Sequence, residues 1–286
     1  MGWKIGLPLR KAELQASLCC PFDGASLVLQ GRSLRCESGH CFDLAKEGYA
    51  NLLPVQNKRS KEPGDNKEMV AARKRFLSSG IYDVVADAMC DAVLSGVDEA
   101  GFSCLDAGCG EGYYLRFLHS RADVTVDAIG LDISKWAVKA AAKADKNATY
   151  IVASNIRLPV EASSIDRLIC MFGFPCYDEF HRVLAARGLL IEVEPGPEHL
   201  HQLREILYPT LKPSREDGQG LPEGFGLVRQ HTKKELIQLT DEQTIQDLLL
   251  MTPHYYRAPV DGRERAAALK SLSVTIDINI RVLSKL

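Results

Sequence analysis

Three glycines occur at alternate positions, Gly108, Gly110 and Gly112, directly after a short apolar run at 103–107. Glycine lets the backbone approach a ligand closely, and a helix that follows such a turn offers free N–H groups to a polar or anionic group. Ligands of an open α/β sheet bind at the carboxyl ends of its strands, where this turn would lie. The pattern predicts a small-molecule site; the alternative is a glycine turn that binds nothing.

Acidic and amide side chains are expected beside this turn. Asp106 precedes the first glycine by two residues, and Asp132 ends the next apolar run, where a carboxylate can accept hydrogen bonds from ribose hydroxyls. The glycine spacing is G-x-G-x-G and not the dinucleotide pattern G-x-G-x-x-G. It therefore favours S-adenosylmethionine over a nicotinamide cofactor, with Asp106 orienting the turn and the amino-acid end of the cofactor. Ser154 and Asn155 follow the third apolar run, where a contact with adenine is expected.

A second group of residues could bind a metal ion. Four residues of suitable type form two pairs about fifteen residues apart, namely Cys20, Asp23, Cys36 and His40. Cysteine and histidine are the usual ligands of zinc, and small modules of this length often need the metal to fold. Asp23 stands where a second cysteine is expected, so either its carboxylate completes the site or Cys19 or Cys41 moves in. The alternative is a metal-free remnant held by packing.

Short apolar runs separated by helical segments predict the strands that position these residues, at 103–107, 128–132, 150–153, 166–172 and 188–193. Strands that alternate with helices form parallel βαβ units, so we expect an open α/β sheet. An acidic residue two positions before the first glycine is typical of the class I (Rossmann-like) methyltransferase fold, here with a small N-terminal zinc-ribbon-like domain that contains the metal module. Apolar and polar residues alternate over 272–282. This period of two predicts a strand of antiparallel character with one buried and one polar face.

The region between the metal module and the strands begins with a polar stretch, 56–67, which we interpret as a linker. Helical spacing of Met69, Val70, Phe76 and Leu77 predicts one helix, and a second is expected over 82–94. These elements divide the chain into an N-terminal domain at 1–55, a basic linker with helices at 56–98, and a methyltransferase domain at 99–286.

Composition and charge limit the classes of function. The nine cysteines are scattered through 286 residues, which argues against a disulfide framework. No run of about 18 uncharged apolar residues is present, and the first fifteen residues lack the apolar centre of a secretory signal, so we expect a soluble cytoplasmic protein without a membrane partner. Residues 1–75 hold 13 Lys and Arg against 8 Asp and Glu, whereas the remainder is acidic. An anionic partner for the first segment or a solvated charged surface would each explain this asymmetry.

Several segments closely resemble the RlmA-type 23S rRNA guanine-N1-methyltransferases, and the resemblance spans roughly residues 18 to 282. The segments that carry it are 42–49, 51–56, 63–65, Glu68 and Met69, Ala72 and Arg73, 108–114, Leu158 and Pro159, 195–197 with His199, and 251–253. Those around the linker are the most specific, because methyltransferases in general lack them. One departure is Asp23 at a cysteine position. Another is 171–175, beside the expected place of the target base, where the family more often has a basic and aromatic segment before the proline.

The resemblance implies a zinc domain that helps to hold 23S rRNA, a class I methyltransferase domain that binds S-adenosylmethionine, and a homodimer. By position it assigns cofactor contacts to Tyr82, to the Gly110-Glu111-Gly112 turn and to His199. It assigns zinc to Cys20, Cys36 and His40, with Asp23 in place of the usual cysteine. Tyr82 and His199 could instead be packing residues. The basic side chains expected along the RNA path are Lys58, Arg59, Lys61, Lys67, Arg73, Lys74 and Arg75.

The reaction implied is methyl transfer to guanine N1, which carries a proton at neutral pH that a base or a solvent path must remove. The sequence does not identify that base. The candidates by position are Glu111, Glu192, Glu194 and His199. The competing functions are a small-molecule methyltransferase, a nicotinamide reductase, and a zinc-containing RNA-binding protein without catalysis.

Overall fold

The computed structural model describes residues 18–57, 60–211 and 220–286. Its strands are β1 Val28–Gln30, β2 Ser33–Arg35, β3 Cys41–Asp43, β4 Ala50–Asn51, β5 Phe102–Ala107, β6 Val126–Asp132, β7 Ala148–Val152, β8 Ile165–Met171, β9 Leu184–Pro195, β10 Phe225–Leu239 and β11 Leu272–Lys285. Its helices are η1 Val55–Asn57, α1 Lys67–Leu77, α2 Asp83–Leu94, α3 Tyr113–Arg121, α4 Lys135–Ala144, α5 Tyr177–Val183, α6 His201–Leu207, α7 Glu242–Met251, α8 Pro253–Arg257 and α9 Val260–Ala267.

An eight-stranded sheet with the order β10-β11-β9-β8-β5-β6-β7-β4 organises the larger part of the chain. Strands β4 to β9 run parallel, whereas β11 is antiparallel to β9 and β10 is antiparallel to β11. All six residues of β5 are buried, as expected for a central strand covered by helices on both faces. The predicted α/β class is confirmed, and each of the five predicted parallel strands is present with its ends shifted by a few residues.

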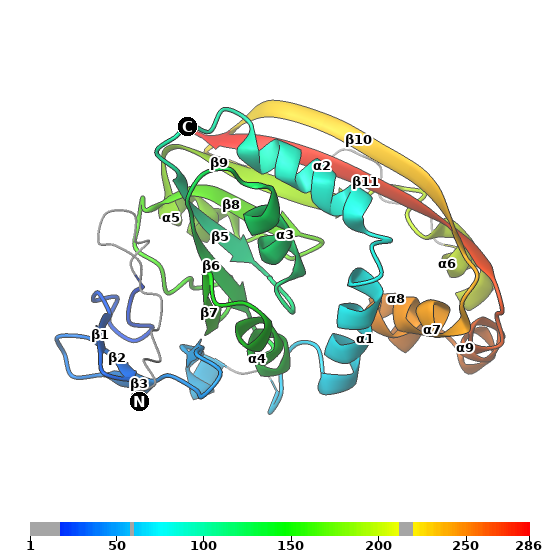
Figure 1. Ribbon diagram of the computed structural model, residues 1–286, viewed down its shortest axis with the longest axis horizontal. Helices are drawn as coiled ribbons and strands as arrows, with labels where there is room; N and C mark the ends of the chain where they lie inside the picture. The colour runs from blue at the N-terminus through cyan, green and yellow to red at the C-terminus, as the bar shows by residue number, and fades with distance from the viewer. Residues whose placement is uncertain (1–17, 58–59, 212–219) are drawn as a thin grey trace, which may run out of the picture.

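Two hydrophobic clusters cover the two faces of this sheet. One contains residues of α2, α3 and α4, the helices turned toward the viewer in Figure 1. The other contains Phe180 and Val183 of α5 together with Leu18 and Leu52 from the N-terminal part of the chain. The two helices predicted between the metal module and the strands are confirmed as α1 and α2. The metal module therefore packs on the face that α5 covers.

The N-terminal module is a small antiparallel sheet of β1, β2 and β3. It is joined to the large sheet through β4, which pairs in parallel with β7, so that Ala50 faces Ile151. The predicted boundary at residue 55 places β4 in the N-terminal domain, although this strand forms the edge of the large sheet. The division into three domains remains a prediction.

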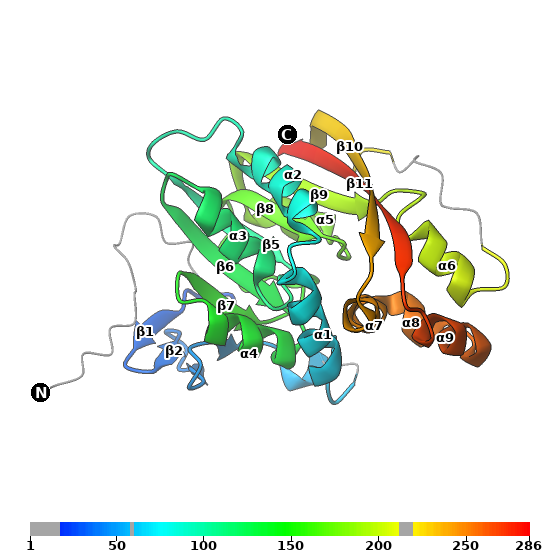
Figure 2. The same ribbon diagram turned by 45° about the vertical axis from the view of Figure 1, so that its right-hand side comes forward.

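The C-terminal part adds two long strands and a group of helices, which lie together in Figure 2. Strand β11 confirms the predicted antiparallel strand, but its polar face is not exposed to solvent as such strands commonly are. Thr275, Asp277 and Arg281 are at most 8% exposed. α6 and the turn after β9 contact the first two, and Arg281 pairs with Glu192 of β9. Gln202 of α6 donates its side-chain amide to the Thr275 hydroxyl at 2.8 Å. Strand β10 was not predicted, because its sequence is largely polar and exposed.

Within the described ranges, none of the helices is both long and apolar enough to span a lipid bilayer.

Candidate functional site

The glycine turn lies at the carboxyl end of β5 and is fixed to the neighbouring strand. The N–H groups of Gly108 and Cys109 both donate to the carbonyl of Leu131 on β6, at 2.8 and 2.9 Å. Gly112, which precedes α3, has a φ of 81°, and a Cβ there would lie 2.8 Å from the Tyr150 hydroxyl. Only glycine fits this close approach without strain. The hydrogen bonds to β6 and the close packing at Gly112 thus fix the conformation of the turn.

Asp106 is fully buried behind the turn, and neither of its carboxylate oxygens has a hydrogen-bond partner among the described residues. Burial, with the nearby carboxylate of Asp132 contributing, raises the pKa of Asp106 to about 8. A buried carboxyl group without a partner is costly unless a ligand pairs with it. A cationic group bound next to the turn would supply that partner.

Asp132, at the end of β6, lies on the other side of the turn. Its carboxylate accepts the N–H of Gly110 at 3.0 Å and the N–H of Ser134 at 2.7 Å, one on each oxygen. Burial raises the pKa of Asp132, whereas these two backbone donors act in the opposite direction. Each oxygen keeps a further lone pair. The carboxylate is therefore held in a fixed orientation and can still accept hydrogen bonds from a pair of hydroxyls.

Asn155 follows β7 and has one unused polar atom. Its side-chain amide donates to the carbonyls of Ala107 and Phe174, at 3.4 and 3.2 Å, which leaves Oδ1 buried without a partner. That oxygen is suited to accept a hydrogen bond from an amino group such as that of adenine. The hydroxyl of Ser154 instead accepts the N–H of Ile156 at 3.4 Å and closes the local turn. The predicted adenine contact of either residue remains a prediction.

Tyr82 and His199 meet although they are far apart in the sequence. The Tyr82 hydroxyl lies 3.4 Å from Nε2 of His199, and Nδ1 of the same ring accepts the N–H of Asp277 at 3.3 Å. Burial lowers the pKa of His199 to about 4, so the ring is neutral at pH 7. Because Nδ1 is an acceptor, the single ring proton lies on Nε2. His199 is thus a hydrogen-bond donor at this place and is poorly suited to be the base.

The carboxylates that were candidates for the base have different surroundings. Glu111 is 1% exposed and forms an ion pair with Arg116, whose Nη2 lies 2.8 and 3.1 Å from its two oxygens. Glu192 is buried and pairs with Arg281 at 2.8 Å. Glu194 is 41% exposed at its side chain and lies 3.8 Å from the same arginine. Of the three carboxylates, Glu194 is the most accessible to a substrate.

Arg73 joins several of the segments on which the family resemblance rests. Its Nη2 donates to the carboxylate of Asp65 at 2.7 Å and to the carbonyl of Met251 at 3.0 Å. Its Cδ would lie 3.7 Å from a Cβ at Gly110. The segments 63–65, 72–73 and 251–253 therefore meet beside the glycine turn. The sequence did not reveal this role, because it depends on contacts between distant residues.

Not all of the basic residues at 56–75 are available to a nucleic acid. Arg73 pairs with Asp65, and Arg75 pairs with the buried Asp247 at 2.5 Å. The prediction that they contact phosphates is not supported for these two residues, because their guanidinium groups hold α1 against the rest of the chain. Lys61, Lys67 and Lys74 have no ion-pair partner among the described residues. Lys58 and Arg59 lie outside the described residues.

The four predicted metal ligands are brought together. One ligand atom from each of Cys20, Asp23, Cys36 and His40 lies within 4.8 Å of all the others. Nδ1 of His40 is 3.1 Å from Asp23 Oδ2, 3.3 Å from Cys36 Sγ and 3.4 Å from Cys20 Sγ. Such separations suit a tetrahedral ion with bonds of about 2.0 to 2.3 Å. Two thiols, an imidazole and a carboxylate form a donor set that fits zinc.

Asp23 occupies the fourth position of this cluster, and the neighbouring cysteines do not. Cys19 and Cys41 are absent from the group, and Cys41 is exposed. The N–H of Ala25 donates to Asp23 at 3.0 Å, and this bond, with side-chain donors from Ser38 and Cys20, lowers the pKa of Asp23. The aspartate is thus ionised and oriented toward the thiols. The alternative in which a neighbouring cysteine moves in is not what the structure shows.

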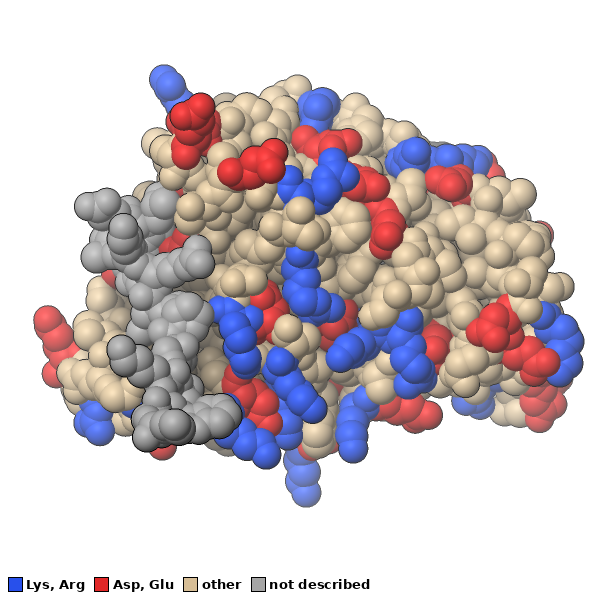
Figure 3. Space-filling model, in the orientation of Figure 1, with Lys and Arg blue, Asp and Glu red and all other residues tan. Residues whose placement is uncertain are grey.

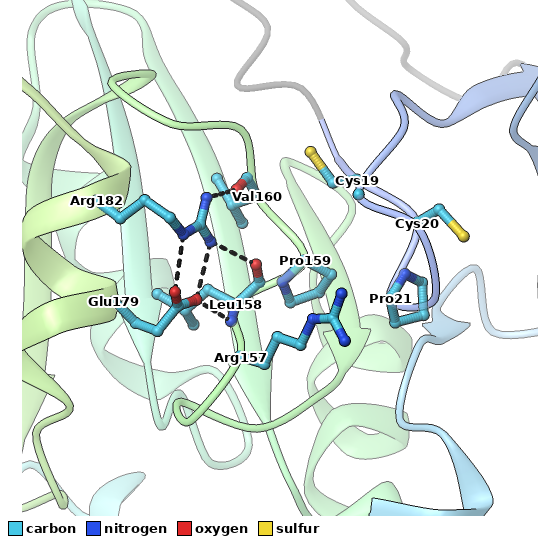
Figure 4. Close-up of a pocket in the computed structure, with 10 residues that line it drawn as sticks. Cys19, Cys20, Pro21, Arg157, Leu158, Pro159, Val160, Glu179 and Arg182 are labelled. Atoms are coloured by element: carbon cyan, nitrogen blue, oxygen red, sulfur yellow. Dashed lines mark hydrogen bonds and ion pairs between the residues drawn. The ribbon is translucent and has the colours of Figure 1, made fainter.

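A cavity of about 300 Å³ lies at the junction of the metal module and the large sheet, away from the glycine turn. Figure 4 shows Arg182 pairing with Glu179 and donating to the carbonyls of Leu158 and Val160. The N–H of Cys19 donates to the carbonyl of Pro159 at 2.9 Å. The Leu158-Pro159 segment therefore connects the two modules, which accounts for its place among the segments of the family resemblance.

Comparisons with known proteins find matches for both the metal module and the larger α/β part of the chain. Residues 18–61 match the family model "RlmA, N-terminal", a zinc ribbon, and residues 104–189 match "Methyltransferase domain". A Bacillus subtilis (strain 168) protein named "Putative 23S rRNA (guanine-N(1)-)-methyltransferase YxjB" is 32% identical over 92% of this chain and 95% of its own length. The "23S rRNA (guanine(748)-N(1))-methyltransferase" of Streptomyces fradiae is 30% identical over 93% of this chain and 95% of its own length.

Among solved structures, the MccD protein matches 71% of this chain and 99% of its own, with a TM-score of 0.47 and 18% identity. This similarity is too low to add to the match of the family models.

Zinc binding is tested by metal analysis of protein purified without added zinc. We expect about one ion per chain, bound through the four ligands, and loss of the ion in Cys36→Ser. Cys41→Ser is the matched control, because Cys41 is an exposed cysteine outside the cluster, and it should retain the ion. Asp23→Cys should hold zinc more tightly, since thiolate is the softer ligand. A metal-free wild type, with the Asp23→Cys variant metal-bound, would show that the aspartate prevents occupancy.

Asp132 is expected to bind the ribose of the cofactor. Asp132→Ala should weaken the binding of S-adenosylmethionine by about 1.5–3 kcal/mol, the range for hydrogen bonds to a charged group. Asp123→Ala removes an exposed carboxylate from the opposite ends of the strands and should leave the affinity unchanged. Isothermal titration calorimetry gives both affinities. Equal affinities of the Asp132 variant and the wild type would remove this assignment.

The raised pKa of Asp106 predicts that cofactor binding depends on pH. Below about pH 8 the free protein keeps Asp106 protonated, whereas a bound cation favours the ionised form, so binding must release a proton. The affinity should therefore rise with pH, by at most about tenfold per pH unit, and level off above the pKa. Calorimetry at pH 7 in buffers of different ionisation enthalpy measures the release. Asp106→Asn should abolish it, and equal proton release by wild type and variant contradicts the assignment.

Proposed function

The chain belongs to the family of RlmA-type 23S rRNA (guanine-N1)-methyltransferases, and on this premise we propose that it transfers a methyl group from S-adenosylmethionine to N1 of one guanine of 23S rRNA. The observation that carries the proposal is that the similarity to relatives of this name extends over more than nine tenths of the chain. It includes the zinc ribbon as well as the methyltransferase domain. A likeness confined to the methyltransferase domain would leave the substrate undefined.

The residues at the glycine turn fit the parts of S-adenosylmethionine. Asp106 provides the unpaired buried carboxyl group for a positively charged end, and Asp132 provides fixed acceptors for the ribose hydroxyls. Oδ1 of Asn155 is placed to accept from the adenine amino group, and the Nε2–H of His199, beside Tyr82, to donate to the carboxylate. The bound cofactor supplies a methyl group on a sulfonium, an excellent leaving group. The work of these side chains is to hold it in one orientation.

The proton on guanine N1 must leave for the nitrogen to attack the methyl carbon. A neutral His199 with its proton on Nε2 is a poor acceptor, and the carboxylates of Glu111 and Glu192 are occupied by arginines. Glu194 is the more accessible carboxylate at the end of β9, adjacent to the loop after β8. We therefore propose Glu194, directly or through a water molecule, as the acceptor of this proton.

The RNA would contact both modules, since the zinc ribbon is fused to the edge of the catalytic sheet through β4. A guanine within a stem must be turned out of its stack to enter a pocket, whereas a guanine in a loop avoids much of that cost. A homodimer and a cytoplasmic location are further parts of this proposal and rest on the family resemblance. Light scattering of the purified protein measures the oligomeric state.

The competing functions predict different substrates. A small-molecule methyltransferase would modify a metabolite and not RNA, and an RNA-binding protein without catalysis would bind RNA and leave it unmodified. The match of residues 104–189 to a methyltransferase domain argues against a nicotinamide reductase.

The proposed reaction is tested by incubating the purified protein with S-adenosylmethionine and unmodified 23S rRNA, followed by mass spectrometry of the nucleosides. We expect 1-methylguanosine as the product, and less of it from Asp106→Asn and Asp132→Ala when the S-adenosylmethionine concentration is below saturation. The same modification should disappear from the 23S rRNA of cells that lack the gene. Methylation at another atom of the base, or on another RNA only, contradicts the proposal.

A further inference from the structure

One face of α4 carries a row of lysines, and the segment 133–147 has no exposed acidic residue beside them. The lysines recur every fourth residue along the helix and continue just past its end: Lys135, Lys139, Lys143 and Lys146. Because an α-helix has 3.6 residues per turn, side chains four apart lie along one face. The opposite face is buried and consists of Ala137, Val138, Ala141 and Ala142. We call these four lysines the α4 lysine ridge.

Acidic side chains neutralise little of the ridge. The only acidic residue at 133–147 is Asp145, which is 6% exposed and accepts hydrogen bonds from the Tyr150 hydroxyl and the Asn147 N–H. Glu47 of the N-terminal module lies 3.6 Å from Lys139. Lys135 and Lys143 are exposed without an ion-pair partner among the described residues. Figure 3 shows Lys and Arg side chains gathered over α4 and α1 on this side of the molecule.

The first lysine of the ridge is placed against the electrostatics of its own helix, whereas Lys143, in the last turn, agrees with the helix dipole. Lys135 is the first residue of α4, where the helix dipole disfavours a positive charge, and the first turn contains no acidic residue. Lysines four apart also repel one another. A surface that only needs to be soluble is expected to mix the two signs of charge. The place of Lys135 is thus unfavourable for α4 by itself, and the row as a whole presents positive charge that an extended anion could pair with.

The ridge connects the two modules that the substrate must contact. At its first end, Ser134 caps α4 and donates its N–H to Asp132 of the cofactor pocket. At its other end, Lys146 donates to the carbonyl of Glu47 in the N-terminal module at 2.8 Å. Partly exposed Trp136 lies between, with the ammonium of Lys139 5.9 Å from its ring centre. Basic and aromatic side chains together are typical of surfaces that bind single-stranded nucleic acid.

We propose that the phosphate backbone of the substrate RNA lies along the α4 lysine ridge, between the zinc ribbon and the cofactor pocket. This inference rests on the proposed function, because it takes RNA as the substrate. It adds a surface within the methyltransferase domain to the basic linker that the sequence suggested. Ion pairing of these lysines with phosphates releases counterions, so the affinity must depend on salt.

The test measures RNA binding separately from catalysis. Fluorescence anisotropy of a labelled 23S rRNA fragment, with S-adenosylhomocysteine present, gives the dissociation constant at several salt concentrations. Lys135→Glu/Lys143→Glu should weaken binding on the order of tenfold near 0.1 M salt, and flatten the slope of log affinity against log salt by about 0.7 for each phosphate that a lysine no longer neutralises. The affinity for S-adenosylhomocysteine should be unchanged.

The matched control is Arg229→Glu/Lys233→Glu on β10, at the opposite edge of the sheet from β4. It changes the net charge by the same amount, and it should bind RNA like the wild type. The thermal unfolding midpoint gives a second readout, because glutamate at position 135 agrees with the helix dipole, whereas glutamate at position 143, in the last turn, opposes it. The two effects offset each other, so the ridge variant should unfold near the wild-type midpoint, while Lys135→Arg/Lys143→Arg keeps the RNA affinity.

Trp136 reports on the location of the RNA. Since Trp3 is the only other tryptophan, the Trp3→Phe variant isolates the fluorescence of Trp136. RNA should quench this fluorescence, and the added ridge substitutions should remove the quenching. Unchanged affinity and salt slope in Lys135→Glu/Lys143→Glu, or equal weakening in the β10 control, overturns the proposal. A wild type that binds through the ridge but methylates an atom other than guanine N1 contradicts the proposed function and still supports the ridge.

Discussion

The guanidinium of Arg73 holds together the parts of the molecule that surround the glycine turn. It bridges Asp65, before α1, and the carbonyl of Met251, at the end of α7, and its stem approaches Gly110. The carbonyl of Asp65 in turn accepts the hydroxyl of Ser134, next to Asp132. A Cβ at Gly64 would lie 2.9 Å from the side chains of Ile133 and Ser134, so the linker packs directly on the turn after β6. The linker is thus part of the pocket and more than a connection between domains.

The strands, and the positions of the proposed cofactor residues at their ends, could be predicted from sequence because their signals are local. A buried parallel strand is a short apolar run, and in such a sheet the residues at its carboxyl end point into the ligand site. Asp106 and Asp132 are therefore brought to one edge by the register of β5 and β6, in which Asp106 pairs with Gly130. The clustering of the four proposed metal ligands was predictable for the same reason, since local turns bring Cys20 and Cys36 together with little dependence on the rest of the chain.

The remainder depends on contacts between distant residues, which leave no periodic signal. Strand β10 is an exposed edge, so its side chains are polar on both faces and show no alternation. The alternation in β11 suggested that its polar face is exposed to solvent. Instead, the turn after β9 covers Asp277, whose carboxylate accepts the N–H of Glu198 at 2.9 Å. In the linker, likewise, the sequence suggested cations available to a nucleic acid, whereas Arg73 and Arg75 form ion pairs. Counting charge along the sequence does not show which cations are already paired.

The protonation states of Asp106, Asp132 and His199 follow from burial and from the hydrogen bonds that each group makes. Asp106 has no hydrogen-bond partner in the part of the chain that the structure describes, so burial favours its neutral form, while Asp132 has two backbone donors that favour its charged form. Two carboxylates side by side could not both remain ionised at low cost without a nearby cation. His199 is kept neutral by burial and therefore adds no positive charge that would compete with a cationic ligand. A cation bound beside Asp106 would favour the ionised form of this carboxyl group.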